Sequence, residues 1–222
     1  MPSDPAAWTR RRILGLGAAL AAGAAVGACS ADRGSTPDRP ERDDAPFAGT
    51  YLDPPFEKPD VAFTDHDGNP FPFREATQGK LSILFFGYTN CPDVCPVYLQ
   101  TMASALDAIG SGPGSRPQVL FVGTDVARDT PEVMKAYLGN IDQSFLGLTG
   151  PETEIANALT ALKLPPVVIG EPDAGGNYEV GHPSHVIACT ADDVSHRIYN
   201  STGVRQQEWV RDLPRLDQGV WK

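Results

Sequence analysis

Two cysteines, Cys91 and Cys95, lie between an apolar run and a segment with helical periodicity, and this arrangement constrains the fold most strongly. The run Leu81–Phe86 is followed by a glycine and has the length and composition of a buried parallel strand. After the cysteines, apolar residues recur at helical spacing until Gly110, a residue type that commonly ends helices. We therefore expect both thiols at a strand-to-helix junction.

The residues around the cysteines indicate where that helix begins. Pro96 cannot lie deep inside a helix, because proline lacks the N–H group and clashes with the preceding turn. Asp93 is a good N-cap residue, which places Cys95 in the first turn and Cys91 just ahead of it. Unpaired N–H groups and the positive end of the helix favour thiolates there. A strand, a cysteine-bearing turn and a helix in this order are typical of thioredoxin-like folds.

The spacing of the two cysteines leaves their chemistry open. Redox thioredoxins use Cys-x-x-Cys, whereas three residues separate Cys91 from Cys95 in this chain. The longer loop permits a disulfide and also suits two thiolates spread around a metal ion. A structural disulfide in an exported protein, a redox-exchanging pair and a soft-metal site are all compatible with this spacing.

The first residues are typical of an export signal rather than of a fold. Arg10–Arg12 precede an apolar, Ala/Gly/Leu-rich stretch, Leu14–Val26, and small residues then lead to Cys29, as in a twin-arginine signal with a bacterial lipoprotein cleavage site. We expect residues 1–28 to be a signal peptide and Cys29 to be lipidated. The protein would then lie on the extracytoplasmic face of the bacterial cell membrane. An uncleaved anchor is the alternative, although the stretch is short for a membrane span.

The rest of the chain divides into a linker and one domain. Residues 29–54 are acidic and Pro-rich and lack periodicity, which predicts a flexible tether. Residues 55–222 have a normal size for one folded core, and we expect a monomer. The formal net charge is -10, and it becomes -12 once the three Arg and one Asp of residues 1–28 are removed. This charge argues against a nucleic-acid partner, whose phosphates attract Lys and Arg.

Strand and helix patterns alternate along the domain. They predict an α/β, thioredoxin-like fold with a central mixed, mainly parallel sheet flanked by helices and preceded by an N-terminal β-hairpin. Thr130 is expected to cap a helix that has Pro131 at its first position. The expected strands are 61–64, 70–73, 81–86, 118–122, 145–148, 178–182, 185–190 and 196–199, and the expected helices begin near residues 93, 131, 151 and 206.

Four blocks of sequence resemble the Sco family, also called SenC/PrrC, of membrane-anchored copper proteins. The resemblance implies a thioredoxin-like fold in which Cys91 and Cys95, with a distant histidine, bind one copper ion. It also implies help in building the binuclear copper centre of cytochrome c oxidase, with the copper-bearing oxidase subunit and other copper chaperones as partners. The blocks are Phe86–Pro96, Asp125–Val133, Gly147–Gly150 and Tyr178–His182, within a resemblance that covers roughly Pro55 to Leu216.

The resemblance also selects the histidine. The family pattern places it after a Tyr-x-Val-x segment, which points to His182. Many members have Asp before this histidine, whereas this chain has Gly181, a change that bears on tuning of the metal rather than on ligation. His185 is the competitor, but positions three apart on a strand face opposite sides, so we do not expect both at one ion. His66 is expected in an exposed turn and His196 at a strand edge.

The donor set agrees with copper. Two thiolates and one imidazole suit Cu(I), and Cu(II) accepts the same set, whereas structural zinc normally takes a fourth protein ligand. Both thiols must be reduced before a metal binds, so a Cys91–Cys95 disulfide would abolish binding. Cys189 lies in an apolar strand and is expected to be a buried, inert thiol.

The same residues permit more than one function. We favour a copper metallochaperone that is not an enzyme. The main alternative is a thiol–disulfide reductase that acts on oxidase cysteines with Cys91 and Cys95 as its redox pair. A thiol peroxidase and a copper-responsive sensor are further hypotheses. Asp125, Arg128 and Asp129, at the expected carboxyl edge of the sheet, either shape a partner-facing loop or form a local ion pair.

Overall fold

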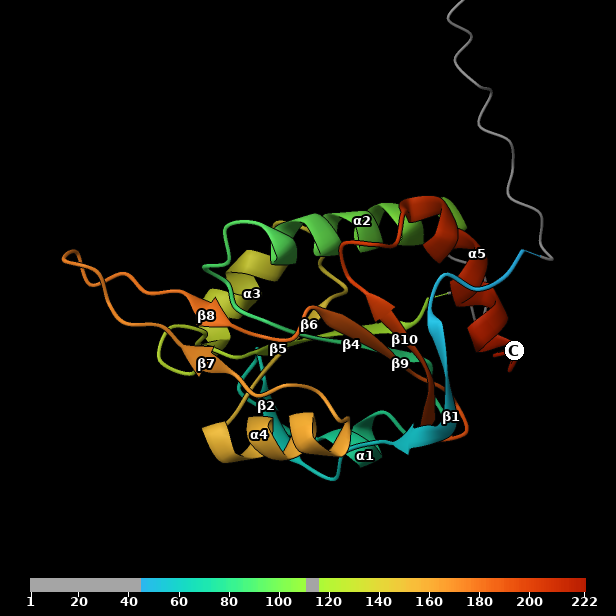
Figure 1. Ribbon diagram of the computed structural model, residues 1–222, viewed down its shortest axis with the longest axis horizontal. Coiled ribbons are helices and arrows are strands. Elements are labelled where there is room, and N and C mark those ends of the chain that lie inside the picture. Colours follow the sequence, from blue (N-terminus) through green and yellow to red (C-terminus); the bar gives the residue numbers. More distant parts are fainter. Residues whose placement is uncertain (1–44, 111–115) are drawn as a thin grey trace, which may run out of the picture. The chain divides into compact units, whose positions relative to one another are not determined.

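The structure is a computed structural model that describes residues 45–110 and 116–222. The predicted signal peptide, the lipidation site Cys29 and residues 29–44 of the predicted linker lie outside the described residues. No helix in the described part combines the length and apolar character needed to cross a membrane. The elements in Figure 1 are β1 (Thr50–Glu57), β2 (Ala62–Asp65), β3 (Pro70–Pro72), α1 (Phe73–Ala76), β4 (Ser82–Gly87), α2 (Val94–Ile109), β5 (Gln118–Gly123), α3 (Pro131–Gly139), β6 (Leu146–Thr149), α4 (Glu152–Ala161), β7 (Val168–Ile169), β8 (Val180–Gly181), β9 (His185–Cys189), β10 (Val194–Asn200) and α5 (Gln206–Asp217).

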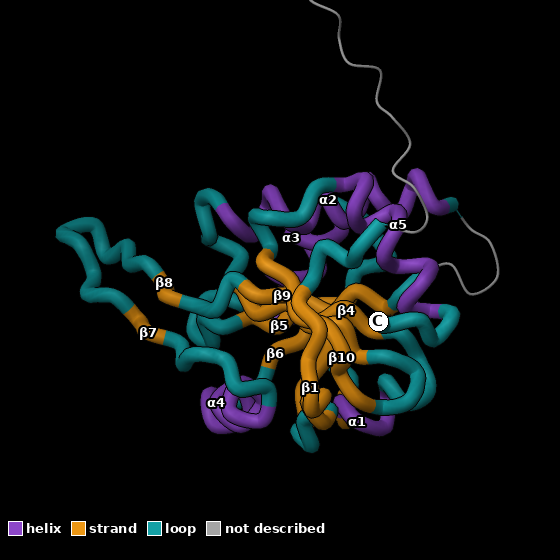
Figure 2. The backbone as a smooth tube through the Cα atoms, turned by 45° about the vertical axis from the view of Figure 1, so that its right-hand side comes forward, coloured by secondary structure: helices purple, strands orange, loops and turns teal. Residues whose placement is uncertain are grey.

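One sheet forms the middle layer, with its strands in the order β1-β10-β9-β4-β5-β6-β2-β3. β4, β5 and β6 run parallel, while every other pairing in the sheet is antiparallel, so the sheet is mixed as predicted. The expectation of a mainly parallel sheet is wrong, because the outer strands join through hairpins and long-range antiparallel pairings rather than helical crossovers. Helices α2, α3 and α5 cover one face, and α1 and α4 cover the other (Figures 1 and 2). β7 and β8 form a separate hairpin that projects from the end of the sheet. These layers confirm the predicted α/β class.

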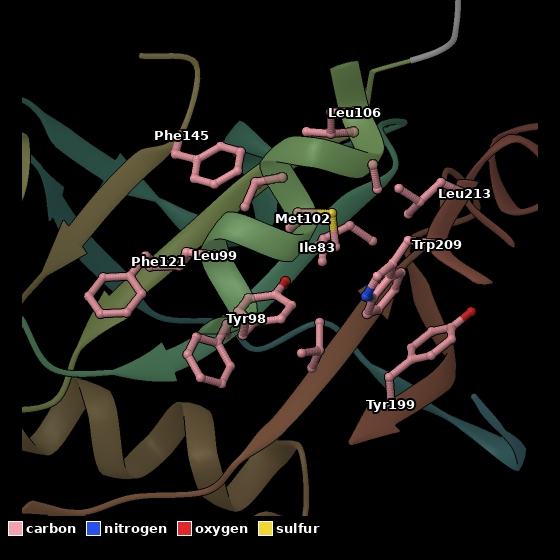
Figure 3. Close-up of a cluster of buried hydrophobic side chains, with 14 of the residues drawn as sticks. Ile83, Tyr98, Leu99, Met102, Leu106, Phe121, Phe145, Tyr199, Trp209 and Leu213 are labelled. Atoms are coloured by element: carbon pink, nitrogen blue, oxygen red, sulfur yellow. The ribbon is translucent and has the colours of Figure 1, made fainter. Parts of the chain in front are cut away.

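β4 is the strand that divides the core. Ile83 and Phe85 join the cluster under α2 and α5, whereas Leu84 and Phe86 join the cluster on the opposite face. All four are fully buried, because successive side chains of a central strand point to opposite, covered faces. Figure 3 shows the first cluster, in which Trp209 of α5 closes the end nearest β10. Each such side chain contributes about 1.5–3 kcal/mol on burial, which fixes the position of β4 in the sheet.

Local signals in the sequence place several elements correctly. β2 and β3 form the predicted hairpin, and β2 also pairs with β6, so the hairpin extends the central sheet. α3 begins at Pro131, and the Thr130 hydroxyl accepts a hydrogen bond from the N–H of Val133 at 3.4 Å. α2 has Asp93 at its N-cap position, as predicted, although the Asp93 side chain makes no capping hydrogen bond.

The end of the predicted linker is part of the sheet. β1 begins at Thr50 and pairs antiparallel with β10, with Tyr51 opposite Arg197. The predicted boundary at residue 54 is therefore wrong, because ordered chain precedes it. β1 contains two prolines and is an edge strand, and edge strands tolerate the polar and proline-rich composition that also characterises linkers. The pairing partner lies far along the chain, so local sequence does not reveal it.

One buried cation joins β1 to the rest of the fold. Lys58, directly after β1, is fully buried, and its Nζ donates to the Thr77 carbonyl at 2.7 Å and to Asp193 Oδ1 at 2.8 Å. The Asp193 side chain is 37% exposed, and its backbone φ is 65°. The hydrogen bond from Lys58 is the main cause that lowers the pKa of Asp193.

Replacing Asp193 with Asn should show how much an unpaired Lys58 destabilises the fold. Asn tolerates the positive φ, so the substitution removes the negative charge and leaves Lys58 without a counter-ion. We expect a loss of about 2 kcal/mol in the free energy of unfolding, measured by urea denaturation at pH 7. The pKa of Asp193 is lowered by folding, so the pair stabilises the fold above the ordinary carboxyl pKa of 3.8 and ceases to do so as pH falls through the lowered value.

Asp67→Asn is the matched control for this measurement. Asp67 pairs with Lys135, and both side chains are about half exposed or more, so the loss should be no more than about 0.5 kcal/mol. The difference in the free energy of unfolding between the wild type and Asp193→Asn should become smaller below about pH 4. Equal losses of unfolding free energy in Asp193→Asn and Asp67→Asn at pH 7 would contradict a stabilising role for the Lys58–Asp193 pair.

Candidate metal centre

The two cysteines lie at the carboxyl end of β4, where the chain turns into α2. Cys95 is fully buried in the first turn of α2, and Cys91, in the preceding loop, is partly exposed. Gly87 makes this packing feasible, because a Cβ added there would lie 2.7 Å from Cys95 Sγ. The N–H of Cys91 donates to the carbonyl of Tyr88 at 3.1 Å, which turns the loop back toward the sheet. The strand end therefore brings one buried and one accessible sulfur together.

The imidazole of His182 completes the group from a distant segment. His182 directly follows β8, and its Nε2 lies 3.6 Å from Cys95 Sγ. Its Nδ1 lies 3.2 Å from the Pro183 carbonyl oxygen, so Nε2 is the ring nitrogen that faces the sulfurs. The rings of Phe85 and Tyr88 stand edge-on to the imidazole, with centroids 6.0 and 5.5 Å away. These contacts hold the orientation that ligation requires.

Cys91, Cys95 and His182 form a group that could hold a metal ion. One ligand atom from each lies within 4.8 Å of the others, and in the described part of the chain no further group of three metal-ligating side chains is so arranged. Two sulfurs and one imidazole nitrogen are the donors that soft metals prefer. A structural zinc site would need a fourth protein ligand. The donor set therefore fits a soft ion better than zinc.

The two thiols differ in their protonation. The Cys91 pKa is lowered to about 4, mainly because the Cys95 thiol donates a hydrogen bond to the Cys91 sulfur, against the opposing effect of burial. The N–H groups of Cys95 and Asp93, and the side chain of His182, also favour the Cys91 thiolate. The Cys95 pKa is raised, first by the proton that it shares with Cys91 and then by its burial. Before any metal binds, the pair thus consists of one thiolate and one thiol.

The remaining histidines and Cys189 lie outside this group. His185 begins β9 and is not part of the three-residue group. The expectation of an exposed His66 is wrong, since 12% of its side chain is exposed and its Nδ1 accepts a hydrogen bond from the N–H of Gly147. His196 lies in the middle of β10 and stacks on Trp221, with ring centroids 4.3 Å apart.

Cys189 is the buried thiol that the sequence predicts. It is fully buried in β9, and its Sγ lies 3.2 Å from the hydroxyl oxygen of Ser195. Burial raises its pKa, so the thiol form persists at neutral pH. Cys189 is therefore inert beside the reactive pair.

Two residues that support the site, Thr89 and Tyr178, were not predicted to have a role from the sequence. Thr89 donates two hydrogen bonds to Asp129, and the Tyr178 hydroxyl donates one to Asp125. Asp125 also pairs with Arg128, which confirms the expected local ion pair. Neither Thr89 nor Tyr178 has a sequence signal that would reveal these partners, because each partner lies at least 40 residues away.

The fold and the Cys–Cys–His group define a thioredoxin-like protein with a partly exposed metal-ligand group. The chain belongs to the SCO1/SenC family, which matches residues 50–216 and confirms the predicted family. It is 32% identical over 158 residues to a Stutzerimonas stutzeri protein whose name assigns it copper binding, covering 71% of this chain and 76% of that protein. It is 39% identical over 122 residues to Saccharomyces cerevisiae Protein SCO1, mitochondrial, covering 53% of this chain and 40% of the yeast protein.

Among solved structures, the chain is similar to Bradyrhizobium japonicum ScoI with copper bound. The identity is 31%, the TM-score is 0.62, and the match covers 72% of this chain and 99% of that chain. The predicted thioredoxin-like fold is thereby confirmed.

The lowered pKa of Cys91 predicts its reactivity. In the reduced protein, alkylation of Cys91 by iodoacetamide should keep a nearly constant rate from about pH 8 to about pH 5, because the thiolate is the nucleophile. In Cys95→Ala the thiol that donates to Cys91 is lost, so the Cys91 pKa should rise and the rate should fall about tenfold for each pH unit below it. Mass spectrometry of timed, acid-quenched samples gives both rates.

Cys95→Ser is the control for that measurement, because its hydroxyl can still donate a hydrogen bond to Cys91. Its pH profile should lie between those of the wild type and Cys95→Ala. A wild-type rate that already falls tenfold between pH 8 and about pH 7 would contradict the assigned thiolate.

Proposed function

We propose that this protein is a copper metallochaperone that carries one copper ion on Cys91, Cys95 and His182. The observation that carries the proposal is the convergence of two sulfurs and the Nε2 of His182 within 4.8 Å. The copper bound in Bradyrhizobium ScoI and the name of the Stutzerimonas relative support copper as the cargo.

The protonation of the site suits the capture of copper. Cys91 is partly exposed and already a thiolate, so it can meet an incoming ion first. Cys95 must then lose its proton as its sulfur binds, which couples copper loading to proton release. Thiolates favour Cu(I), and the same three donors also accept Cu(II). Oxidation of the two thiols to a disulfide would remove both sulfur donors and therefore block loading.

The proposed recipient is the copper-bearing subunit of cytochrome c oxidase, and other copper chaperones are the proposed donors. Membership of the SCO1/SenC family supports this role in building the binuclear copper centre. In this proposal, residues 1–28 are removed as a signal peptide and a lipid on Cys29 holds the domain at the extracytoplasmic face of the bacterial cell membrane. The twin-arginine pattern and the small residues before Cys29 support that location. One domain on a tether is expected to act as a monomer.

A thiol–disulfide reductase is the second candidate, and the lowered pKa of Cys91 favours it. A thiolate on Cys91 can attack a disulfide of a partner, and Cys95, close behind it, can resolve the mixed disulfide. The electrons would pass from the two thiols to the partner, leaving a Cys91–Cys95 disulfide. Catalytic turnover on an oxidase disulfide, without stable copper binding, would favour this function over the first.

Copper titration of the reduced chain 30–222 tests the proposed site, because this form lacks Cys29. We expect one copper ion per wild-type chain, with affinity lowered by more than about 100-fold in Cys91→Ser, Cys95→Ser and His182→Ala, since each removes a donor. His185→Ala is the matched control and should bind copper like the wild type. Weak binding by the wild type, together with a reversible disulfide, would instead support the reductase.

A further inference from the structure

A turn at residues 125–129 follows β5 at the carboxyl edge of the sheet, beside the end of β4. Thr124, just before the turn, ties the two strand ends together, because its N–H and its hydroxyl both donate to the Gly87 carbonyl, at 2.7 and 2.9 Å. Inside the turn, two backbone N–H groups donate to the carbonyl of Asp125, at 2.9 and 2.8 Å. The turn is thus a closed unit next to the cysteine-bearing loop.

One end of the turn holds the cysteine-bearing loop. Asp129 is fully buried, and its Oδ1 accepts hydrogen bonds from the N–H and the hydroxyl of Thr89, at 2.9 and 2.7 Å. Its Oδ2 accepts a hydrogen bond from the N–H of Asp125 at 3.1 Å. A buried carboxylate is stable only when its oxygens are paired, so these three donors fix its position. Thr89 precedes Cys91 by two residues, and the loop is thereby fixed as well.

The other end of the turn holds the segment that leads to His182. The Tyr178 hydroxyl donates to Asp125 Oδ1 at 2.9 Å, and Arg128 pairs with the other oxygen of the same carboxylate. Arg128 Nη2 also donates to the Tyr178 carbonyl at 3.1 Å, and its guanidinium lies 3.7 Å from the centroid of the Tyr178 ring. Such a stacked, forked contact is specific to arginine.

Only the short strand β8 separates Tyr178 from the imidazole of His182. Between Tyr178 and His182 the chain forms β8, which pairs with β7 so that Gly181 lies opposite Val168. The projecting hairpin is visible in Figure 1, with β8 on the side nearer α3. A shift of Tyr178 would therefore be passed through β8 to His182.

We propose that the turn at residues 125–129 is a positioning device that holds both halves of the site, each through its own side chains. Asp129 positions the cysteine loop, and Asp125 with Arg128 positions the segment that ends in His182. The cysteine and histidine segments meet across a sequence separation of 87 residues, between Cys95 and His182. This inference rests on the proposed copper function, but the positions of the cysteine loop and of His182 can each be measured in the metal-free protein.

Tyr178→Phe tests the histidine half. The substitution removes the hydroxyl that binds Asp125 and keeps the ring on which Arg128 stacks. We expect copper affinity to fall about 10-fold or more, with weaker nitrogen hyperfine coupling in the Cu(II) EPR spectrum, because His182 is less well held. In the metal-free protein, the His182 ring resonances in NMR should move, since they sense the edges of Phe85 and Tyr88.

Thr89→Val tests the cysteine half. The substitution removes the hydroxyl donor to Asp129 and keeps the backbone N–H donor. A looser loop lowers the effective concentration of one thiol at the other, so the Cys91–Cys95 disulfide should become less favoured against glutathione by about 10-fold. The His182 ring resonances should stay in place in this variant, as should the glutathione equilibrium in Tyr178→Phe.

A conservative variant away from the site serves as the control. Tyr51→Phe removes a ring hydroxyl on β1, the far edge of the sheet. It should match the wild type in every readout. Movement of both readouts in both site variants, or no change beyond the control in either one, would overturn separate positioning of the two halves. If wild-type protein takes up no copper, the proposed function fails, and the NMR and glutathione measurements still decide the role of the turn.

Discussion

The site depends on the packing of the Cys95 sulfur against the end of β4. An added Cβ at Gly87 would lie 2.7 Å from that sulfur and 2.7 Å from the Phe121 ring, so only glycine lets α2 sit so close to the sheet. This closeness buries Cys95 completely and places Cys91 at the rim. It also leaves a sulfur 3.6 Å from His182 Nε2, where the segment after β8 can reach it.

Unequal burial gives two identical side chains different roles. The buried Cys95 retains its proton, and by donating it toward Cys91 it lowers the Cys91 pKa to about 4. A thiolate at the rim can capture a soft cation or attack a disulfide, so the metallochaperone and the reductase share their first chemical requirement. They differ at His182, whose Nε2 adds a third donor for a metal and has no part in disulfide exchange. The histidine is therefore the feature that favours the copper function.

Local chemistry made much of the fold predictable from sequence, whereas long-range contacts did not. The buried run of β4, the proline after Cys95 and the Thr130–Pro131 start of α3 each act within a few residues, and the structure confirms them. β1 depends on β10 for its order, so its polar, proline-rich sequence resembled a linker. The cysteine pair could be identified by spacing, but His182 came from family resemblance, since no local pattern distinguishes it from His185.

The two attachments of the site to the turn at residues 125–129 differ in strength for a physical reason. Asp129 is fully buried and has three donors, so its bonds to the cysteine loop form where water cannot replace them. Arg128 keeps 24% of its side chain exposed, and solvent can compensate part of its contact with Tyr178 when that contact opens. The attachment of the histidine segment is therefore the easier of the two to open. In the proposed copper function, the imidazole would be the donor that leaves first while both sulfurs are still held.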